Sequence, residues 1–157
     1  LFHTLNHSIC KTLSFFCAGR LGQIYGTHEM ERLTGVFQRA PIWGLGLFTS
    51  ILALIGVAPF CIFMSEWQLL KAIVDTRSFW AGFFFVFGSC VVFVGALHHA
   101  ISMVWGEKSN GPSEPSALSD YFLVLFPLAL LLLLGLWMPD FLFSAIQKAS
   151  RVIGGGL

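Results

Sequence analysis

The apolar segment from Ile42 to Val74 constrains the fold more than any other part of the sequence. As one straight helix its 33 residues would reach about 50 Å, whereas the hydrocarbon core of a bilayer is about 30 Å thick. Pro59 lacks a backbone N–H and clashes with the carbonyl four residues before it, so the helix is expected to break between Gly56 and Pro59. A break there would place Glu66 at membrane depth, beside irregular backbone that is tolerated only inside protein or along a wet cavity.

An unbroken helix from Trp43 to about Phe63 is the alternative for this segment. It would leave Glu66 and Trp67 at the membrane interface, as an ordinary charge and an aromatic residue of the interfacial belt. The segment by itself does not decide between the two interpretations.

The composition identifies a membrane protein. Hydrophobic residues make up 56% of the chain and charged residues 11%, whereas soluble domains contain about 25% charged residues. The formal net charge is +1 and no run of Lys or Arg occurs, which argues against a nucleic-acid-binding surface. The predicted fold class is therefore all-α, a polytopic membrane helix bundle.

About four membrane spans are expected, at residues 1–19, 42–74 with the break, 79–105 and 121–139. Residues 106–120 have the Gly, Pro and Ser content of an exposed loop, and residues 140–157 form an amphipathic tail. Alternating spans would divide the eight Lys and Arg residues other than Lys11 four against four, so the positive-inside rule does not orient the spans.

The cysteines are interpreted as small buried apolar residues, neither disulfides nor metal ligands, because all four lie in apolar runs without C-x-x-C spacing: Cys10, Cys17, Cys61 and Cys90. No phosphate-binding loop, catalytic triad, zinc spacing or haem-attachment motif is present, so neither a metal nor a cofactor is expected on this chain. The sequence begins at Leu1 without a start Met or a signal peptide, and we interpret it as the C-terminal piece of a longer polypeptide.

Three ionisable residues at four-residue spacing occur in the first expected span: His3, His7 and Lys11. This spacing places them along one helix face, about 6 Å apart per step. Ionisable residues within a membrane span are energetically costly and are interpreted as functional by default. The alternative is a helix whose polar face contacts water. Burial shifts the pKa of a lysine and of a glutamate in opposite directions, so Lys11 and Glu66 could both titrate near neutral pH. His98 and His99 are secondary candidates, for which an interfacial position is the favoured interpretation.

Three features together resemble the antiporter-like, proton-pumping membrane subunits of respiratory complex I, Mrp-type antiporters and membrane-bound hydrogenases. They are the His3-x3-His7-x3-Lys11 spacing, a following helix that reaches Pro59, and the tripeptide at residues 65–67, some 55 residues beyond the lysine. This SEW tripeptide and the run LHHAISMVWGE at residues 97–107 are similar to the hydrogenase-4 component F and formate hydrogenlyase type of subunit.

The resemblance implies a chain from the second of two inverted repeats, with His7 and Lys11 on a central hydrophilic axis. Glu66 would occupy the position in a discontinuous helix where family members carry Lys or Glu, and residues 106–120 would face the cytoplasm. The implied partners are other membrane subunits and a peripheral redox module, in the cytoplasmic membrane of a prokaryote. The chain departs from the family by having Ala58 and Ile62 near the break, where Pro and Gly are usual.

The resulting prediction is a non-redox subunit of an oxidoreductase complex that translocates protons along a His/Lys/Glu row. His3 and His7 would exchange protons with Lys11, water would link Lys11 to Glu66, and Glu66 would gate the exit. The sequence does not distinguish H⁺ from Na⁺, nor a hydrogenase from a formate-oxidising or NADH dehydrogenase complex.

Two other functions are weighed against this one. A haem-binding electron-transfer subunit would need facing helices, which His7 with His98 or His99 could supply. An inert anchor for a peripheral oxidoreductase would use its charges only to hold helices together.

Overall fold

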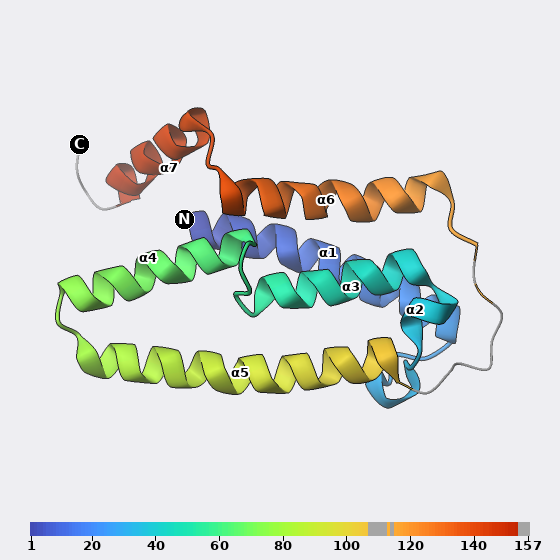
Figure 1. Ribbon diagram of the computed structural model, residues 1–157. Helices are drawn as coiled ribbons and strands as arrows, with labels where there is room; N and C mark the ends of the chain where they lie inside the picture. Colours follow the sequence, from blue (N-terminus) through green and yellow to red (C-terminus); the bar gives the residue numbers. More distant parts are fainter. Residues whose placement is uncertain (107–112, 114, 154–157) are drawn as a thin grey trace.

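The computed structural model describes residues 1–106, 113 and 115–153, and over these residues its regular structure is entirely helical. This confirms the predicted all-α class. Figure 1 shows long helices packed side by side along one direction. The elements are α1 (Phe2–Tyr25), a 3₁₀ turn η1 (Met30–Arg32), α2 (Val36–Arg39), α3 (Pro41–Leu54), α4 (Cys61–Asp75), α5 (Phe79–Trp105), α6 (Leu118–Leu136) and α7 (Asp140–Ile153).

The best-packed part of the molecule is formed by α1, α3 and α6, which contact one another pairwise. Their buried side chains are largely aliphatic or small, such as Leu13 and Leu21 of α1, Ala53 of α3 and Leu131 of α6. Inside this core the hydroxyl of Ser14 donates a hydrogen bond of 2.8 Å to Ser50 Oγ. The buried polar pair joins α1 to α3, since a hydroxyl removed from water needs a partner.

The long apolar segment is interrupted between α3 and α4, and Gly56 and Pro59 both lie in the interruption. The two helices contain 14 and 15 residues, so each is only about 21 to 23 Å long and too short to cross a bilayer alone. They follow one another in the same general direction in Figure 1 and run antiparallel to α5. Within the interruption Gly56 has a left-handed backbone, with φ of 74°, and the Ala58–Pro59 peptide bond is cis.

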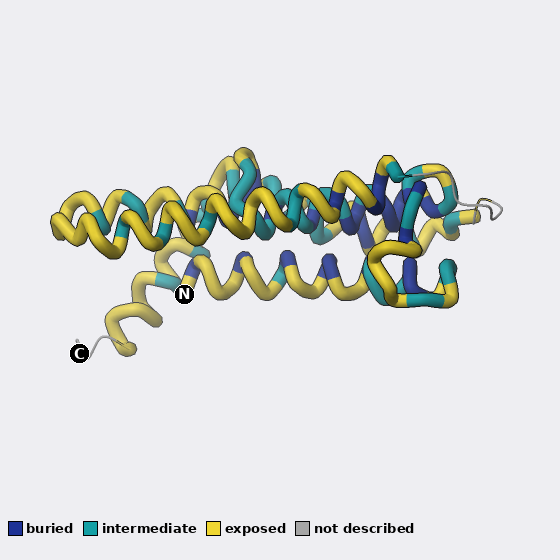
Figure 2. The backbone as a smooth tube through the Cα atoms, turned by 90° about the horizontal axis from the view of Figure 1, so that it is seen from below, coloured by how far each residue is buried: buried dark blue, intermediate teal, exposed yellow. Residues whose placement is uncertain are grey.

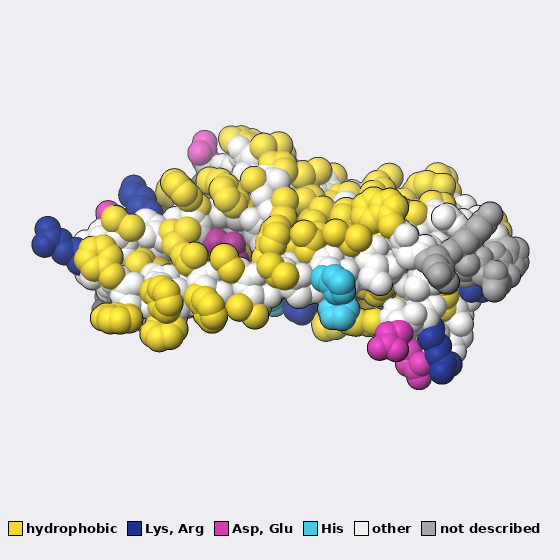
Figure 3. Space-filling model, turned by 60° about the horizontal axis from the view of Figure 1, so that its bottom comes forward, with side chains coloured by type: hydrophobic (Ala, Val, Ile, Leu, Met, Phe, Trp, Pro, Cys, Tyr) yellow, Lys and Arg dark blue, Asp and Glu magenta, His cyan; other side chains and the backbone are white. Residues whose placement is uncertain are grey.

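Two helices of the described chain are long and apolar enough to cross a membrane, namely α5 with 27 residues and α6 with 19. Most of α5 is exposed, as Figure 2 shows. Its neighbours are α4 near its start and α2 and α3 towards its end, and they cover only part of its surface. Figure 3 shows apolar side chains over most of one face, with Lys, Arg, Asp and Glu mainly towards its two ends. This distribution suits an outer surface in contact with lipid.

The end of α5 is held by an aromatic cluster of Phe37, Phe48 and Trp105. The Trp105 ring lies edge-on to both phenylalanines, with centroid distances of 5.5 Å to Phe37 and 5.0 Å to Phe48. Edge-to-face pairs at such distances add to the energy of burial. The cluster therefore fixes α5 against α2 and α3.

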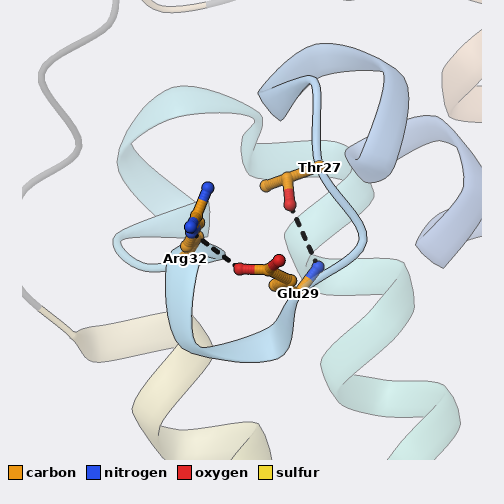
Figure 4. A network of polar contacts seen from close by, with 3 residues as sticks. All are labelled: Thr27, Glu29 and Arg32. Atoms are coloured by element: carbon orange, nitrogen blue, oxygen red, sulfur yellow. Dashed lines mark hydrogen bonds and ion pairs between the residues drawn. The ribbon is translucent and has the colours of Figure 1, made fainter.

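The expected first span ends at residue 19, but α1 continues to Tyr25, where Gly26 terminates it in the left-handed conformation with φ of 67°. The following connection contains η1 and the short helix α2. Figure 4 shows its contacts: the backbone N–H of Glu29 donates to Thr27 Oγ1, and the Glu29 carboxylate pairs with Arg32 at 2.7 Å. Both charged side chains are exposed, so the ion pair contributes little stability.

The remaining expectations are met to different extents. Cys10, Cys17 and Cys61 are buried free thiols, but Cys90 is exposed, so the expectation of four buried cysteines is wrong for that residue. The reason is its place on the uncovered part of α5. Residues 107–112 and 114 of the expected loop and the end of the tail at 154–157 lie outside the described residues, and α7 accounts for the described part of the tail.

Candidate functional site

Glu66 lies in the second turn of α4, with its carboxylate packed against the break in the long segment. A Cβ atom on Gly56 would overlap the Glu66 carboxylate, so only a glycine leaves room for this contact. The positive φ of Gly56 is a conformation that L-residues with side chains adopt at a cost. The backbone turn and the position of the acid thus depend on the same residue.

His3 of α1 reaches the residue next to this acid. Its Nδ1 lies 2.8 Å from the hydroxyl oxygen of Ser65, which is buried on α4. The same oxygen lies 2.7 Å from the carbonyl of Ile62, one turn earlier. His3, Ser65 and Glu66 also line one cavity of about 510 Å³, together with Gln68, Leu69 and Phe85. Residues separated by more than 60 positions in the sequence are therefore brought together.

A second cavity, of about 310 Å³, lies between the break, α4 and the middle of α5. Its lining is mostly apolar and aromatic, with Ser89 and Cys90 contributed by α5. Among the residues lining it, Glu66 is the one charged side chain. Since Glu66 lines both cavities, its carboxylate is positioned to exchange protons with either.

The row on α1 turns away from α4 as it proceeds. The rings of His3 and His7 are stacked, with centroids 5.9 Å apart. Lys11 is exposed, its ammonium lies 5.5 Å from the ring centre of Phe15, and it lines neither cavity beside Glu66. Each step of four residues advances about 400° around a helix, so Lys11 is rotated by about 80° relative to His3. The structure therefore brings His3, but not Lys11, to Glu66.

The buried face of α1 carries polar residues that were not predicted from the sequence. Asn6 is fully buried beside the break, and its amide lies 3.5 Å from the carbonyl of Cys61, which makes a long hydrogen bond. Its amide oxygen has no partner among the described residues. Asn6, Cys10 and Ser14 recur at four-residue spacing, a pattern that could have identified a buried polar stripe beside the row of ionisable groups.

His98 and His99 occupy the far half of α5. Their rings lie 5.7 Å apart, both are exposed, and His99 lines a cavity of about 470 Å³ with Glu29 and Glu31. Helix α3 packs against both α1 and α5, and the ring contacts of the described chain pair His7 with His3 and His98 with His99. In the described part of the chain no group of three His, Cys, Asp or Glu side chains could hold a metal ion.

The family described as "NADH:quinone oxidoreductase/Mrp antiporter, TM" matches residues 1–92, more than half of the chain. The chain belongs to this family. The matched part contains α1, the break and α4, and therefore every residue of the expected row, so the resemblance drawn from the sequence is confirmed.

The chain is also similar to individual proteins named as hydrogenase-4 components and antiporter subunits. The hydrogenase-4 component F homolog of Methylacidiphilum infernorum is 28% identical over 154 residues, which cover 98% of this chain and 32% of the relative. An Na(+)/H(+) antiporter subunit of Bacillus subtilis is 26% identical over 87% of this chain and 27% of its own length. Hydrogenase-4 component B of Escherichia coli is 36% identical over 46% of this chain and 11% of the relative.

The chain spans about a third of the length of the first curated relatives that it matches. No solved structure matches it. The family and the membrane setting are thus established for the chain.

Proposed function

We propose that this chain is part of a proton-translocating membrane subunit of a redox-driven complex, in which protons pass along His3, His7, Lys11 and Glu66. The observation that carries the proposal is the position of Glu66, at the break of a discontinuous helix and in one cavity with His3. A break at membrane depth supplies unpaired backbone groups and room for water, which ion-conducting sites require.

Glu66 is proposed as the gate. Its carboxylate borders the cavity shared with His3 on one side and the apolar cavity beside α5 on the other. A proton taken up from the first cavity neutralises the acid, and a neutral side chain moves into apolar surroundings at far lower cost than a charged one. Release into the second cavity restores the carboxylate.

The row on α1 is proposed to supply the proton in the order Lys11, His7, His3, because His3 is the member of the row that hydrogen-bonds to α4. At 5.9 Å and an effective dielectric constant of about 20, two positive charges on His3 and His7 would repel by about 3 kcal/mol, less where water screens them. Moving one charge across 100 mV requires about 2.3 kcal/mol. Charging one ring can therefore drive a proton off its neighbour against a membrane potential.

The partners are proposed from the same family. Relatives are named as components of hydrogenase-4 and formate hydrogenlyase and as antiporter subunits. We place this chain beside other membrane subunits and a peripheral redox module, in the cytoplasmic membrane of a prokaryote. Lys11, which is exposed on α1, would face membrane helices outside this chain.

The test is substitution in the full-length protein within its complex. Glu66→Gln and Lys11→Ala should each lower proton translocation into membrane vesicles, followed with a pH-sensitive dye, at least about tenfold, since a positioned proton-transfer group typically contributes more than that. Glu31→Gln in the connection after α1 and Lys148→Ala on α7 are the matched controls, because both side chains are exposed and away from the two cavities beside Glu66.

The result has three distinct outcomes. Loss of translocation in a complex that still assembles supports the proposal. Normal translocation in both Glu66→Gln and Lys11→Ala overturns it. Failure of both variants to assemble, with the two controls intact, would support the inert-anchor function instead.

A further inference from the structure

The hydrogen bonds around Ser65 contain a constraint on His3. Ser65 Oγ lies 2.7 Å from the carbonyl oxygen of Ile62 and 2.8 Å from His3 Nδ1. Two oxygens at 2.7 Å repel one another unless a proton lies between them, and a carbonyl has none to give. The single hydroxyl proton of Ser65 is therefore used in the bond to Ile62.

The hydrogen in the contact between Ser65 and His3 must then come from the imidazole of His3. Because the Ser65 proton is engaged, the hydroxyl can only accept a hydrogen bond from His3, and Nδ1 of His3 must carry the donating proton. In a neutral imidazole one nitrogen donates and the other accepts, so Nε2 is left with the lone pair.

We propose that Ser65 is a positioning residue that holds neutral His3 as the Nδ1–H tautomer, so that His3 takes up and releases protons through Nε2 alone. The inference rests on the proposed function, and it specifies how one member of the row works. When Nε2 accepts a proton the ring becomes an imidazolium with both nitrogens protonated, and the same Nε2 proton leaves when the ring is discharged. The Nδ1 proton stays on its nitrogen throughout.

In this arrangement His3 stores a proton on Nε2 and does not pass one through its ring. A histidine that conducts through its ring accepts a proton at one nitrogen and releases one from the other. Release from Nδ1 towards Ser65 would require the hydroxyl to give up its bond to Ile62, so the route from His3 to Glu66 runs through their shared cavity and not through the serine.

The chain contains a matched control for Ser65. Ser50 Oγ donates to the carbonyl of Leu47 at 2.8 Å and accepts a hydrogen bond from Ser14 of α1. Both serines are thus bonded to a carbonyl of their own helix, and both accept a donor from α1, but only Ser65 faces a histidine. Ser50→Ala removes the same kind of interhelical bond without affecting any imidazole.

The experiment is nitrogen-15 NMR of full-length, histidine-labelled protein in lipid, above the pH at which His3 becomes neutral, with the His3 signals assigned by their loss in His3→Gln. The wild type should show His3 as Nδ1–H. In Ser65→Ala the ratio of Nδ1–H to Nε2–H forms should fall at least about fivefold, the effect of one hydrogen bond on an equilibrium. Ser65→Thr, which keeps the hydroxyl, should restore the ratio, and Ser50→Ala should leave it unchanged.

A neutral His3 found as Nε2–H in the wild type, which requires no variant to fold, overturns the inference. An unchanged ratio in Ser65→Ala does the same. Normal proton translocation by His3→Gln would instead remove His3 from the proposed proton path. That result leaves the nitrogen shifts, and the tautomer they report, as they were.

Discussion

The carboxylate of Glu66 packs against the Cα of Gly56, ten residues earlier, at the point where the long apolar segment loses its helical conformation. The contact links two requirements in one place. The left-handed backbone at Gly56 turns the chain, and the missing side chain leaves room for the acid. Changes at Gly56 should therefore affect both the fold and the proposed gate.

Gly56→Ala is expected to abolish translocation. It should also lower the free energy of unfolding by more than backbone strain alone would. The left-handed conformation costs an L-residue with a side chain about 1–2 kcal/mol, and the added methyl group must in addition displace the Glu66 carboxylate. The matched control is Gly26→Ala, which has a similar φ of 67° but has nothing within 4 Å of the added atom. Thermal unfolding and translocation of the two full-length variants provide the measurement. Equal effects of the two substitutions would show that the contact with Glu66 has no role.

Gly135→Ala should loosen the packing of α6 on the break. A Cβ atom at this position would overlap the carbonyl of Pro59 and approach Phe60 and Cys61, all at backbone atoms that cannot rotate away. Overpacking of this kind typically costs about 1–3 kcal/mol, so the melting temperature of the detergent-solubilised protein should fall. Gly88→Ala on α5, where nothing lies near the added atom, should not lower that temperature, because alanine is the better helix former. A stable Gly135→Ala variant would mean that α6 does not pack against the break in the assembled protein.

The break and the helical class were predictable because they follow from local chemistry. Pro59 and the length of the apolar segment act within a few residues, and the interruption between Leu54 and Cys61 lies where these signals point. The bond between His3 and Ser65 was not predictable, since it depends on which face of α1 packs against α4. Only the assembled helices determine such a contact between residues 62 positions apart.

The position of Lys11 shows the same limit. Four-residue spacing is not a straight line along α1, because the drift of about 40° per step carries Lys11 away from α4 while His3 remains beside it. The exposure of Cys90 could likewise not be read from its apolar neighbours, because an apolar residue can face either protein or lipid. Local composition therefore identified the candidate residues, and tertiary packing decided which of them meet.

Trp105→Ala is expected to release the end of α5 from the bundle. The substitution removes two edge-to-face contacts, with Phe37 and Phe48, each worth about 0.5–1.5 kcal/mol beyond burial, so a total loss of about 1–3 kcal/mol is expected. Trp80→Ala serves as the control, because Trp80 lies at the other end of α5 and pairs only with Phe83 of its own helix in the described chain. Hydrogen exchange of the amides in residues 95–105 should rise in the first variant alone. Unchanged exchange in Trp105→Ala would contradict the role of the cluster.

Labelling of Cys90 should reveal whether water enters the cavity that Glu66 shares with the middle of α5. Cys90 lines that cavity and is exposed, whereas Cys10, Cys17 and Cys61 are buried. Maleimides react with the thiolate, which forms only where water or a polar group supports the charge. A membrane-permeant maleimide should therefore modify Cys90 in the folded full-length protein well before the three buried thiols, as followed by mass spectrometry of the corresponding peptides. Cys90→Ser provides the blank. Labelling of Cys90 that appears only after denaturation would show a dry cavity, and Glu66 could then not release its proton on that side.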